Sequence, residues 1–142
     1  MLVLNRFTII MFALNGAEFC RDGGMYRLRI EFHFDAAHKL IGHEGKCAEL
    51  HGHTWKVEIF VAGERLNDIE VLVDFNMLKE KASKTIEKLD HKFLNDIKEI
   101  GNPTCENLSK YIFENLDLPN RIKLEKVRIW EGEKSWCEYY EA

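Results

Sequence analysis

The sequence predicts an α+β domain in which a four-stranded antiparallel sheet carries two helices on one face. Two observations lead to this class. Apolar residues alternate with polar ones along residues 26–34 and again along residues 55–61, as in strands with one buried face. After these strands, apolar residues recur at helical spacing in two segments. The order ββααββ is that of two hairpins separated by two helices, a two-layer arrangement.

The first hairpin is predicted from strict alternation. Every second residue of 26–34 is apolar, and the residues between them are charged or histidine. After a glycine-containing loop, the alternation returns from Trp55 to Val61 and stops at Gly63. Each of these two strands is therefore expected to bury one face and to expose the other.

The two helices are predicted from caps and spacing. Asp74 can cap the first helix, which is expected to end near Leu89. Its predicted inward positions are Phe75, Leu78, Ala82, Ile86 and Leu89. Pro103 opens the second helix, because proline is tolerated in a first turn, and Pro119 lies beyond its end.

Two further strands, at about residues 124–130 and 136–140, complete the predicted sheet. An open sheet of four strands leaves its outer strands with unpaired backbone groups. Association with other subunits is therefore expected.

Composition excludes several classes of protein. The 142 residues include 20 Lys and Arg against 24 Asp and Glu, a net charge of −4. This balance offers no basic surface for nucleic acid. No apolar run reaches the roughly 20 residues of a membrane span. The four cysteines form no CxxC pair, which argues against a disulfide framework and favours a reducing, cytoplasmic setting.

Residues 1–24 differ in texture from the rest of the chain. They contain a short apolar stretch and end in a Gly-Gly pair directly before Met25. A secretory signal is one interpretation. The favoured interpretation is that translation starts at Met25 and that residues 1–24 are an extension outside the domain of residues 25–142.

Histidines are concentrated between positions 33 and 53, where five of the six lie. Residues i and i+2 of an extended chain face the same side, so His51 and His53 are expected to point together. A hairpin would bring His38 close to them. Three imidazoles without an obligatory fourth protein ligand are typical of a catalytic Zn²⁺ site, although iron, nickel or cobalt also accept nitrogen ligands. Cys47 either closes a structural Cys-plus-three-His site or stays free as a base or nucleophile.

Carboxylates and one further histidine are candidates for proton transfer and binding. Asp90 precedes His91 directly, and a carboxylate beside a histidine is a common proton-transfer pair, although the two residues could simply end a helix. Glu131 follows Ile129 by two positions, so its carboxylate is expected on the buried face. Glu106 lies in the first turn of the second helix, where it favours the helix dipole or helps hold a ligand.

Five short motifs, taken in order, resemble the 6-pyruvoyltetrahydropterin synthase superfamily. They are FDAAH at 34–38, CAELHGH at 47–53, LDH at 89–91, PTCE at 103–106 and IWE at 129–131. The resemblance extends from Met25 to the C-terminus. It implies the tunnelling fold, in which three subunits join their sheets into a barrel and two barrels stack into a hexamer with active sites between subunits.

Within the superfamily, the three residues between Cys47 and His51 resemble the 6-carboxytetrahydropterin synthase branch. That branch converts 7,8-dihydroneopterin triphosphate to 6-carboxytetrahydropterin, acetaldehyde and triphosphate, on the route to 7-deazaguanines such as queuosine and archaeosine. The pyruvoyl-forming branch is the alternative enzyme. A non-catalytic protein with a structural zinc is the alternative from another class.

The resemblance also implies roles for individual residues. Zinc would be bound by His38, His51 and His53. The proton-abstracting base would be Cys47, and His91, oriented by Asp90, would relay protons. The pterin would be held by Glu131, which is also counted with the relay, in a pocket lined by Thr104 and Glu106. Gly132 stands where the family often has threonine, and residues 1–24 have no counterpart in it.

Overall fold

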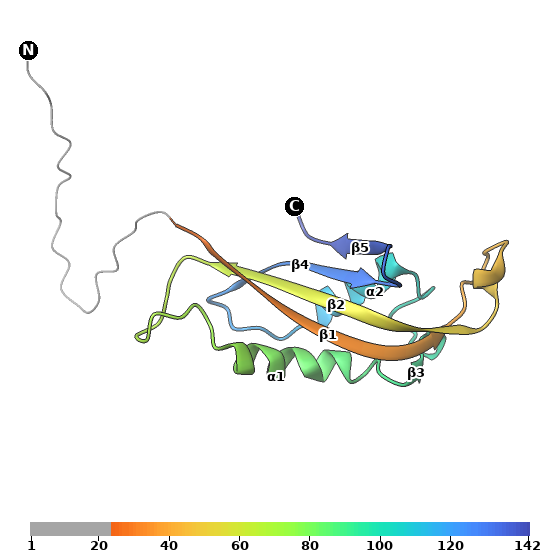
Figure 1. Cartoon of the computed structure of the whole chain (residues 1–142), viewed down its shortest axis with the longest axis horizontal. Coiled ribbons are helices and arrows are strands. Elements are labelled where there is room, and N and C mark those ends of the chain that lie inside the picture. The colour runs from red at the N-terminus through yellow and green to blue at the C-terminus, as the bar shows by residue number, and fades with distance from the viewer. Residues whose placement is uncertain (1–23) are drawn as a thin grey trace, which may run out of the picture.

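The computed structural model describes residues 24–142, so the predicted extension at 1–24 lies, except for Gly24, outside the described residues. One five-stranded sheet has the order β3-β1-β2-β4-β5. The strands are β1 (Tyr26–His38), β2 (His51–Gly63), β3 (Lys92–Phe93), β4 (Lys123–Trp130) and β5 (Trp136–Tyr139). The helices are α1 (Phe75–Ile86) and α2 (Cys105–Asn115), both on the same side of the sheet (Figure 1).

The predicted α+β class is confirmed, with one added strand. β3 consists of two residues and pairs with β1 in parallel, Ala36 opposite Lys92 and Ala37 opposite Phe93. Two residues carry no readable alternation, so only the path of the chain after α1 reveals this strand. The remaining neighbours in the sheet are antiparallel, as expected from two hairpins.

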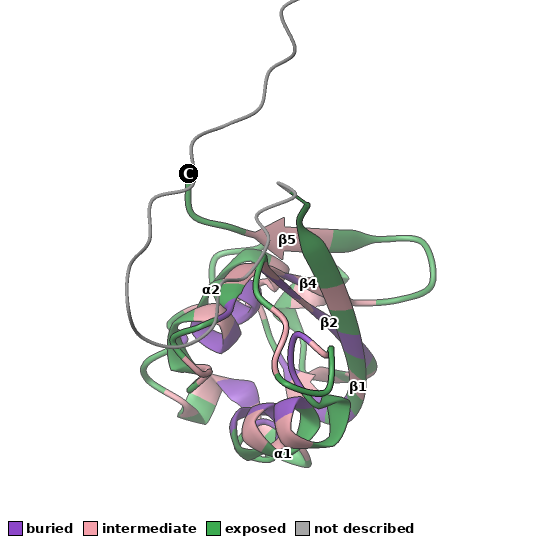
Figure 2. Cartoon of the chain, turned by 90° about the vertical axis from the view of Figure 1, so that its left-hand side faces the viewer, coloured by how far each residue is buried: buried purple, intermediate pink, exposed green. Residues whose placement is uncertain are grey.

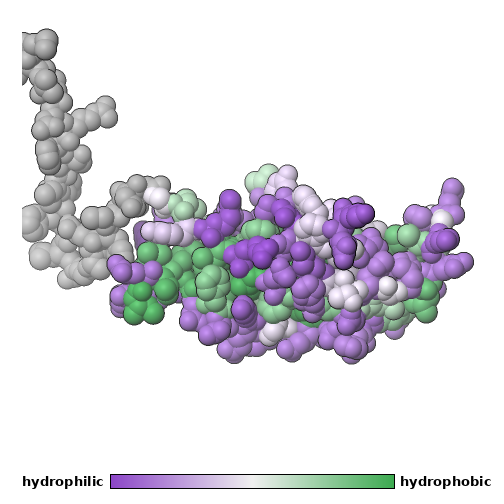
Figure 3. Space-filling model, viewed as in Figure 1, coloured by the Kyte–Doolittle hydropathy of each residue, from purple (hydrophilic) through white to green (hydrophobic). Residues whose placement is uncertain are grey.

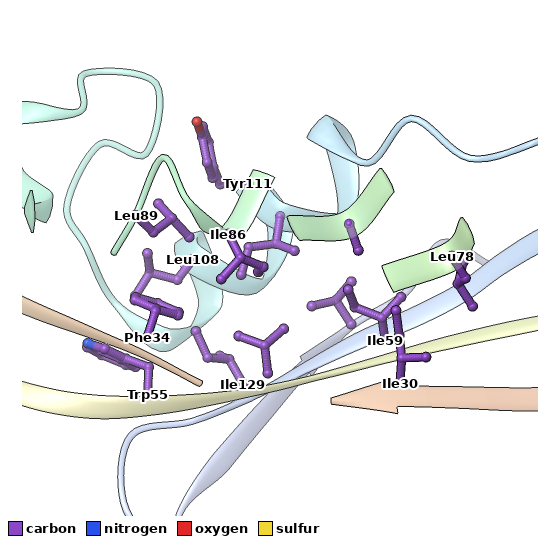
Figure 4. Close-up of a cluster of buried hydrophobic side chains, with 14 of the residues drawn as sticks. Ile30, Phe34, Trp55, Ile59, Leu78, Ile86, Leu89, Leu108, Tyr111 and Ile129 are labelled. Carbon is purple, nitrogen blue, oxygen red and sulfur yellow. The ribbon is translucent and has the colours of Figure 1, made fainter. Parts of the chain in front are cut away.

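The core lies between the helices and the sheet, where buried residues gather (Figure 2). The alternation predicted for β1 is seen in its burial, with Ile30 and Phe34 inside and the arginines outside. Figure 4 shows Leu78 of α1 and Leu108 of α2 directed toward strand residues such as Ile59. The prediction that Phe75 faces the core is wrong: it is 48% exposed, because the first helical residue turns away from the sheet.

The helix-free side of the sheet is polar but contains one buried charge. Glu58 is only 3% exposed and accepts a hydrogen bond of 2.7 Å from the Trp130 indole. It also pairs with the Arg29 guanidinium. Burial opposes ionisation of this carboxyl, yet the Trp130 hydrogen bond and the Arg29 charge together hold the pKa of Glu58 below its usual value.

Most of the surface seen in Figure 3 is hydrophilic, with smaller apolar areas between charged residues. Within residues 24–142, no helix is both long and apolar enough to span a membrane.

Candidate metal centre and ring pocket

Three histidines meet where β1 ends and β2 begins. His38 is the last residue of β1 and lies directly opposite His51, the first residue of β2. His53 follows two positions later, on the same face of the strand. The side chain of His38 is almost fully buried, at 1% exposure. Strand register and alternation therefore bring together the three imidazoles predicted as a metal site.

Backbone carbonyls determine the tautomers of two of these imidazoles. Nδ1 of His38 lies 2.8 Å from the carbonyl oxygen of Pro103, and Nδ1 of His51 lies 2.7 Å from that of Glu49. A carbonyl oxygen only accepts hydrogen bonds, so each Nδ1 carries the proton and each neutral ring presents a lone pair at Nε2. These two Nε2 atoms face each other at 3.1 Å. Two lone pairs at this distance repel unless a proton or a cation lies between them.

A fourth donor atom converges on the same point. Oε1 of Glu131 lies 3.2 Å from Nε2 of His53 and 3.4 Å from Nε2 of His38. Nε2 of His53 is buried and, among residues 24–142, makes no hydrogen bond. Burial lowers the pKa of His53 despite the nearby Glu131 carboxylate, which favours the neutral ring that a metal requires.

This donor set fits a divalent cation. The three imidazole nitrogens and the Glu131 oxygen all lie within 4.8 Å of one another. Three histidines with a fourth, oxygen-filled position are the ligand pattern of catalytic zinc sites. The thiol of Cys47 is not one of the converging atoms. A closed site of Cys47 and three histidines is therefore not formed among the described residues.

A cavity of about 250 Å³ opens beside the metal centre. We call it the ring pocket. It is lined by His38, Leu40, Thr104, Cys105, Glu106, Glu131, Ser135, Trp136 and Cys137. The structure thus brings the three predicted binding residues, Thr104, Glu106 and Glu131, into one cavity that His38 also lines.

The N-terminus of α2 forms one wall of the ring pocket. Thr104 caps this helix, its hydroxyl accepting a hydrogen bond of 3.2 Å from the backbone N–H of Asn107. The carbonyl of the preceding residue, Pro103, is the one that fixes the His38 tautomer. One short segment therefore orients His38 and shapes the pocket.

Sequence reasoning missed the role of Cys105. Its thiol lies 3.6 Å from Oε2 of Glu131 and donates to it. Burial, followed by the charge of Glu131, raises the pKa of Cys105 to about 12, so the thiol stays protonated as a donor. The sequence by itself indicates no functional role for Cys105. Its position between Thr104 and Glu106, two predicted pocket residues, was the available signal.

Asp90 and His91 lie outside the ring pocket, at the β3 edge of the sheet. Nδ1 of His91 is 3.0 Å from Oδ2 of Asp90, and the backbone N–H of Asp35 donates to Oδ1 of Asp90 at 2.9 Å. These contacts, that of Asp35 first, lower the pKa of Asp90. His91 has a left-handed backbone with φ of 55° and is 78% exposed at its side chain. The two side chains therefore contact each other and lie beyond the end of α1 at Ile86.

His91 of this pair borders a second hollow, of about 590 Å³, which is also lined by Asp35, Thr54 and His53 of the histidine cluster. Cys47 lies in a short 3-10 turn, Lys46–Ala48, and lines neither this hollow nor the ring pocket. Within one chain, the predicted metal and binding residues meet around Glu131, His91 shares a hollow with His53 alone of the three histidines, and Cys47 lines neither cavity.

The fold and site define an α+β protein with a three-histidine centre and an adjoining pocket of about 250 Å³. Residues 27–142 match the model of the 6-pyruvoyl tetrahydropterin synthase family, and the chain belongs to this family.

Named relatives agree with this membership. A 6-carboxy-5,6,7,8-tetrahydropterin synthase of Haemophilus influenzae is 33% identical over 141 residues, covering 82% of this chain and 100% of the relative. A dihydroneopterin monophosphate aldolase of Pyrococcus furiosus is 39% identical over 107 residues, covering 74% of this chain and 89% of the relative. The 6-pyruvoyl tetrahydropterin synthase structure of Caenorhabditis elegans superposes with a TM-score of 0.73 at 25% identity, covering 84% of this chain and 97% of that one. Together these relatives support a family enzyme of pterin chemistry.

Proposed function

We propose that this protein is a zinc-dependent 6-carboxy-5,6,7,8-tetrahydropterin synthase. It would convert 7,8-dihydroneopterin triphosphate and water to 6-carboxytetrahydropterin, acetaldehyde and triphosphate, a step toward 7-deazaguanines. The observation that carries the proposal is the convergence of His38, His51, His53 and Glu131 beside the ring pocket. The name of the Haemophilus influenzae relative supports the choice of product.

Zinc would be held by His38, His51 and His53, whose free Nε2 atoms match its preference for neutral imidazole. When bound, zinc supplies Lewis acidity to hydroxyl groups of the substrate side chain. The Pro103 and Glu49 carbonyls would keep two of these rings in the ligating tautomer.

The pterin ring would be held by this chain's own carboxylates. Glu131 would accept hydrogen bonds from the amino and ring N–H groups of the pterin, and charge-assisted pairs of this kind fix orientation as well as affinity. The Cys105 thiol, 3.6 Å from Oε2, would hold the carboxylate in place. Thr104 and Glu106 would contact the ring from the start of α2.

Proton transfer would involve Cys47 as the base and His91, oriented by Asp90, as the relay. These residues are absent from the ring pocket of their own chain. We therefore propose that each active site is completed by a second subunit, within a homohexamer of two stacked trimers. Within residues 24–142, β3 and β5 are the outer strands of the sheet, and their outer edges are compatible with such joining of sheets.

Product analysis tests this function. The zinc-loaded protein is incubated with 7,8-dihydroneopterin triphosphate, and the products are identified by mass spectrometry. Formation of 6-carboxytetrahydropterin with one acetaldehyde per turnover is expected. A 6-pyruvoyl product would indicate the other branch of the superfamily.

Two further arms separate the remaining alternatives. Dihydroneopterin monophosphate is offered in parallel, because the Pyrococcus furiosus relative is named for an aldolase of that compound. Chelation of the metal should abolish turnover while the fold, followed by circular dichroism, persists. A chain that keeps its metal but transforms neither compound would contradict the proposal and favour a structural zinc.

A further inference from the structure

The loop that joins the metal ligands His38 and His51 also carries Cys47. Residues 39–50 project beyond the end of the sheet (Figure 1). Of these twelve residues, only Leu40 and Cys47 are half-buried, and the others are exposed. The loop therefore has no apolar core of its own, and its shape depends on hydrogen bonds.

Two asparagine side chains hold one end of this loop. The backbone N–H of Lys39 donates to Oδ1 of Asn95, and Nδ2 of Asn95 donates back to the Lys39 carbonyl, both at 2.9 Å. In the same way, the backbone N–H of Ile41 donates to Oδ1 of Asn102 at 2.9 Å, and Nδ2 of Asn102 donates to the Ile41 carbonyl at 3.0 Å. Each side-chain amide uses one donor and one acceptor. It therefore pairs with the N–H and C=O of one residue, as the backbone of a neighbouring strand would.

Leu40, which lies between Lys39 and Ile41, makes its backbone hydrogen bond on the opposite side of residues 39–41. The backbone N–H of Leu40 donates to the carbonyl of Cys47 at 2.8 Å. Residues 39–41 therefore form an extended strip. The backbones of Lys39 and Ile41 bond to the two asparagine side chains, and the backbone of Leu40 bonds to Cys47. The two half-buried residues of the loop are those that this bond joins.

Both asparagines are anchored in turn. Asn95 belongs to the 3-10 helix Leu94–Asp96, whose Leu94 is fully buried. The backbone carbonyl of Asn102 accepts hydrogen bonds of 2.8 Å from the Asn107 side chain and from the Thr104 N–H. The connection thus runs from the core, through two amides and the strip, to the backbone of Cys47.

We propose that Asn95 and Asn102 are positioning residues for Cys47. They hold the strip at residues 39–41, and the strip holds the turn that presents the thiol. The inference rests on the proposed function only for what Cys47 does. The hydrogen-bonded connection from the two asparagines to Cys47, which we call the tether, does not depend on the proposed function. Misplacement of a reacting group by about 1 Å can cost about 100-fold in rate, so a loosened turn should lower kcat.

The variants Asn95→Ala and Asn102→Ala test this arrangement. Asn95→Asp keeps the acceptor for Lys39 but loses the donor, and should give an intermediate effect. The matched control is Asn67→Ala, because the Asn67 side chain accepts from Ile69 and Val71 at 3.1 Å in a loop before α1, away from the site.

The first readout is alkylation of Cys47 by iodoacetamide, resolved by peptide mass spectrometry with Cys105 as internal reference. It is measured at about pH 9.5, where an ordinary thiol is largely ionised, whereas the protonated Cys105 thiol reacts slowly and reports any general loosening of the fold. In both alanine variants the Cys47 rate should rise about five-fold or more, as in a locally opened segment. The Cys105 rate should not change.

The second readout is the division between kcat and KM, together with zinc content. In the alanine variants kcat for 7,8-dihydroneopterin triphosphate should fall about 10- to 100-fold, with zinc content and KM near wild type. Cys47 alkylation within two-fold of wild type in both variants would overturn the proposal. The proposal would also be overturned if Asn67→Ala changed Cys47 alkylation and kcat equally, or if zinc content fell in parallel with kcat. A wild-type protein without turnover would refute the proposed function alone, since alkylation still decides the tether.

Discussion

Glu131 and His53 lie at the ends of neighbouring strands, with the Glu131 carboxylate oxygen 3.2 Å from Nε2 of His53. The other carboxylate oxygen of Glu131 faces the Cys105 thiol in the ring pocket. One side chain therefore borders both the metal centre and the cavity proposed for the pterin. A substitution of Glu131 can therefore show whether metal binding and pterin binding depend on the same side chain.

Glu131→Gln should weaken pterin binding far more than metal binding. The substitution keeps the shape but removes the negative charge that strengthens hydrogen bonds from the ring, and a loss of about 1.5–3 kcal/mol is expected. Neopterin binding by fluorescence quenching and zinc by elemental analysis measure the two effects. Glu133→Gln is the control, because Glu133 does not line the ring pocket. Equal loss of zinc and pterin in Glu131→Gln would contradict this division.

His51→Ala should lose stoichiometric zinc. Two imidazoles and a carboxylate remain, and removal of one of three histidine ligands leaves an incomplete site. His33→Ala is the matched control, since His33 is exposed on the other face of β1 and is not one of the converging ligands. Metal content per chain after dialysis is the measurement. Retention of one zinc by His51→Ala would exclude this histidine as a ligand.

Cys47→Ala and His91→Ala should complement each other in mixed oligomers. If each site takes Cys47 from one subunit and His91 from another, random assembly of equal amounts leaves about one quarter of the sites intact. The two variants are unfolded together, refolded, and assayed for acetaldehyde release. Each variant refolded alone is the control and should be inactive. Absence of recovered activity in a properly assembled mixture would place both residues in one subunit's site.

Glu58→Gln should destabilise the fold in a pH-dependent way. The lowered pKa of Glu58 means that its ionised form stabilises the native state above the unfolded pKa, and that this contribution is lost as pH falls through the folded pKa. We expect a loss of about 1–3 kcal/mol at pH 7, as for hydrogen bonds to charged groups, which shrinks at about pH 3.5. Urea unfolding at both values measures it.

Glu31→Gln is the control for this stability effect. Glu31 also pairs with Arg29, at 3.2 Å, but on the exposed surface. Exposed ion pairs contribute about 0–1 kcal/mol, so the control should stay close to wild type at both pH values. A Glu58→Gln effect that is the same at pH 7 and pH 3.5 would show that the charge of Glu58 does not matter.

Local periodicity predicted much of the fold and the direction of several site residues. Alternation along residues 26–34 assigned the faces of β1, and the spacing of His51 and His53 placed both imidazoles on one side. The spacing of Ile129 and Glu131 directed the carboxylate toward the same side, where the structure finds it beside the histidines. Each of these inferences depends only on the two-residue repeat of an extended chain.

By itself, the sequence determined which side of an element each of these residues faces. Only the tertiary structure decided which of them meet: the pairing of β3 with β1, the hydrogen bond from the Asp35 backbone to Asp90, the Cys105 thiol against Glu131, and the histidine and glutamate cluster that, among the described residues, does not include Cys47. The physical reason is that the backbone repeat is set by neighbouring residues. A distance between residues far apart in the chain depends on strand register, loop path and the tertiary hydrogen bonds that hold them.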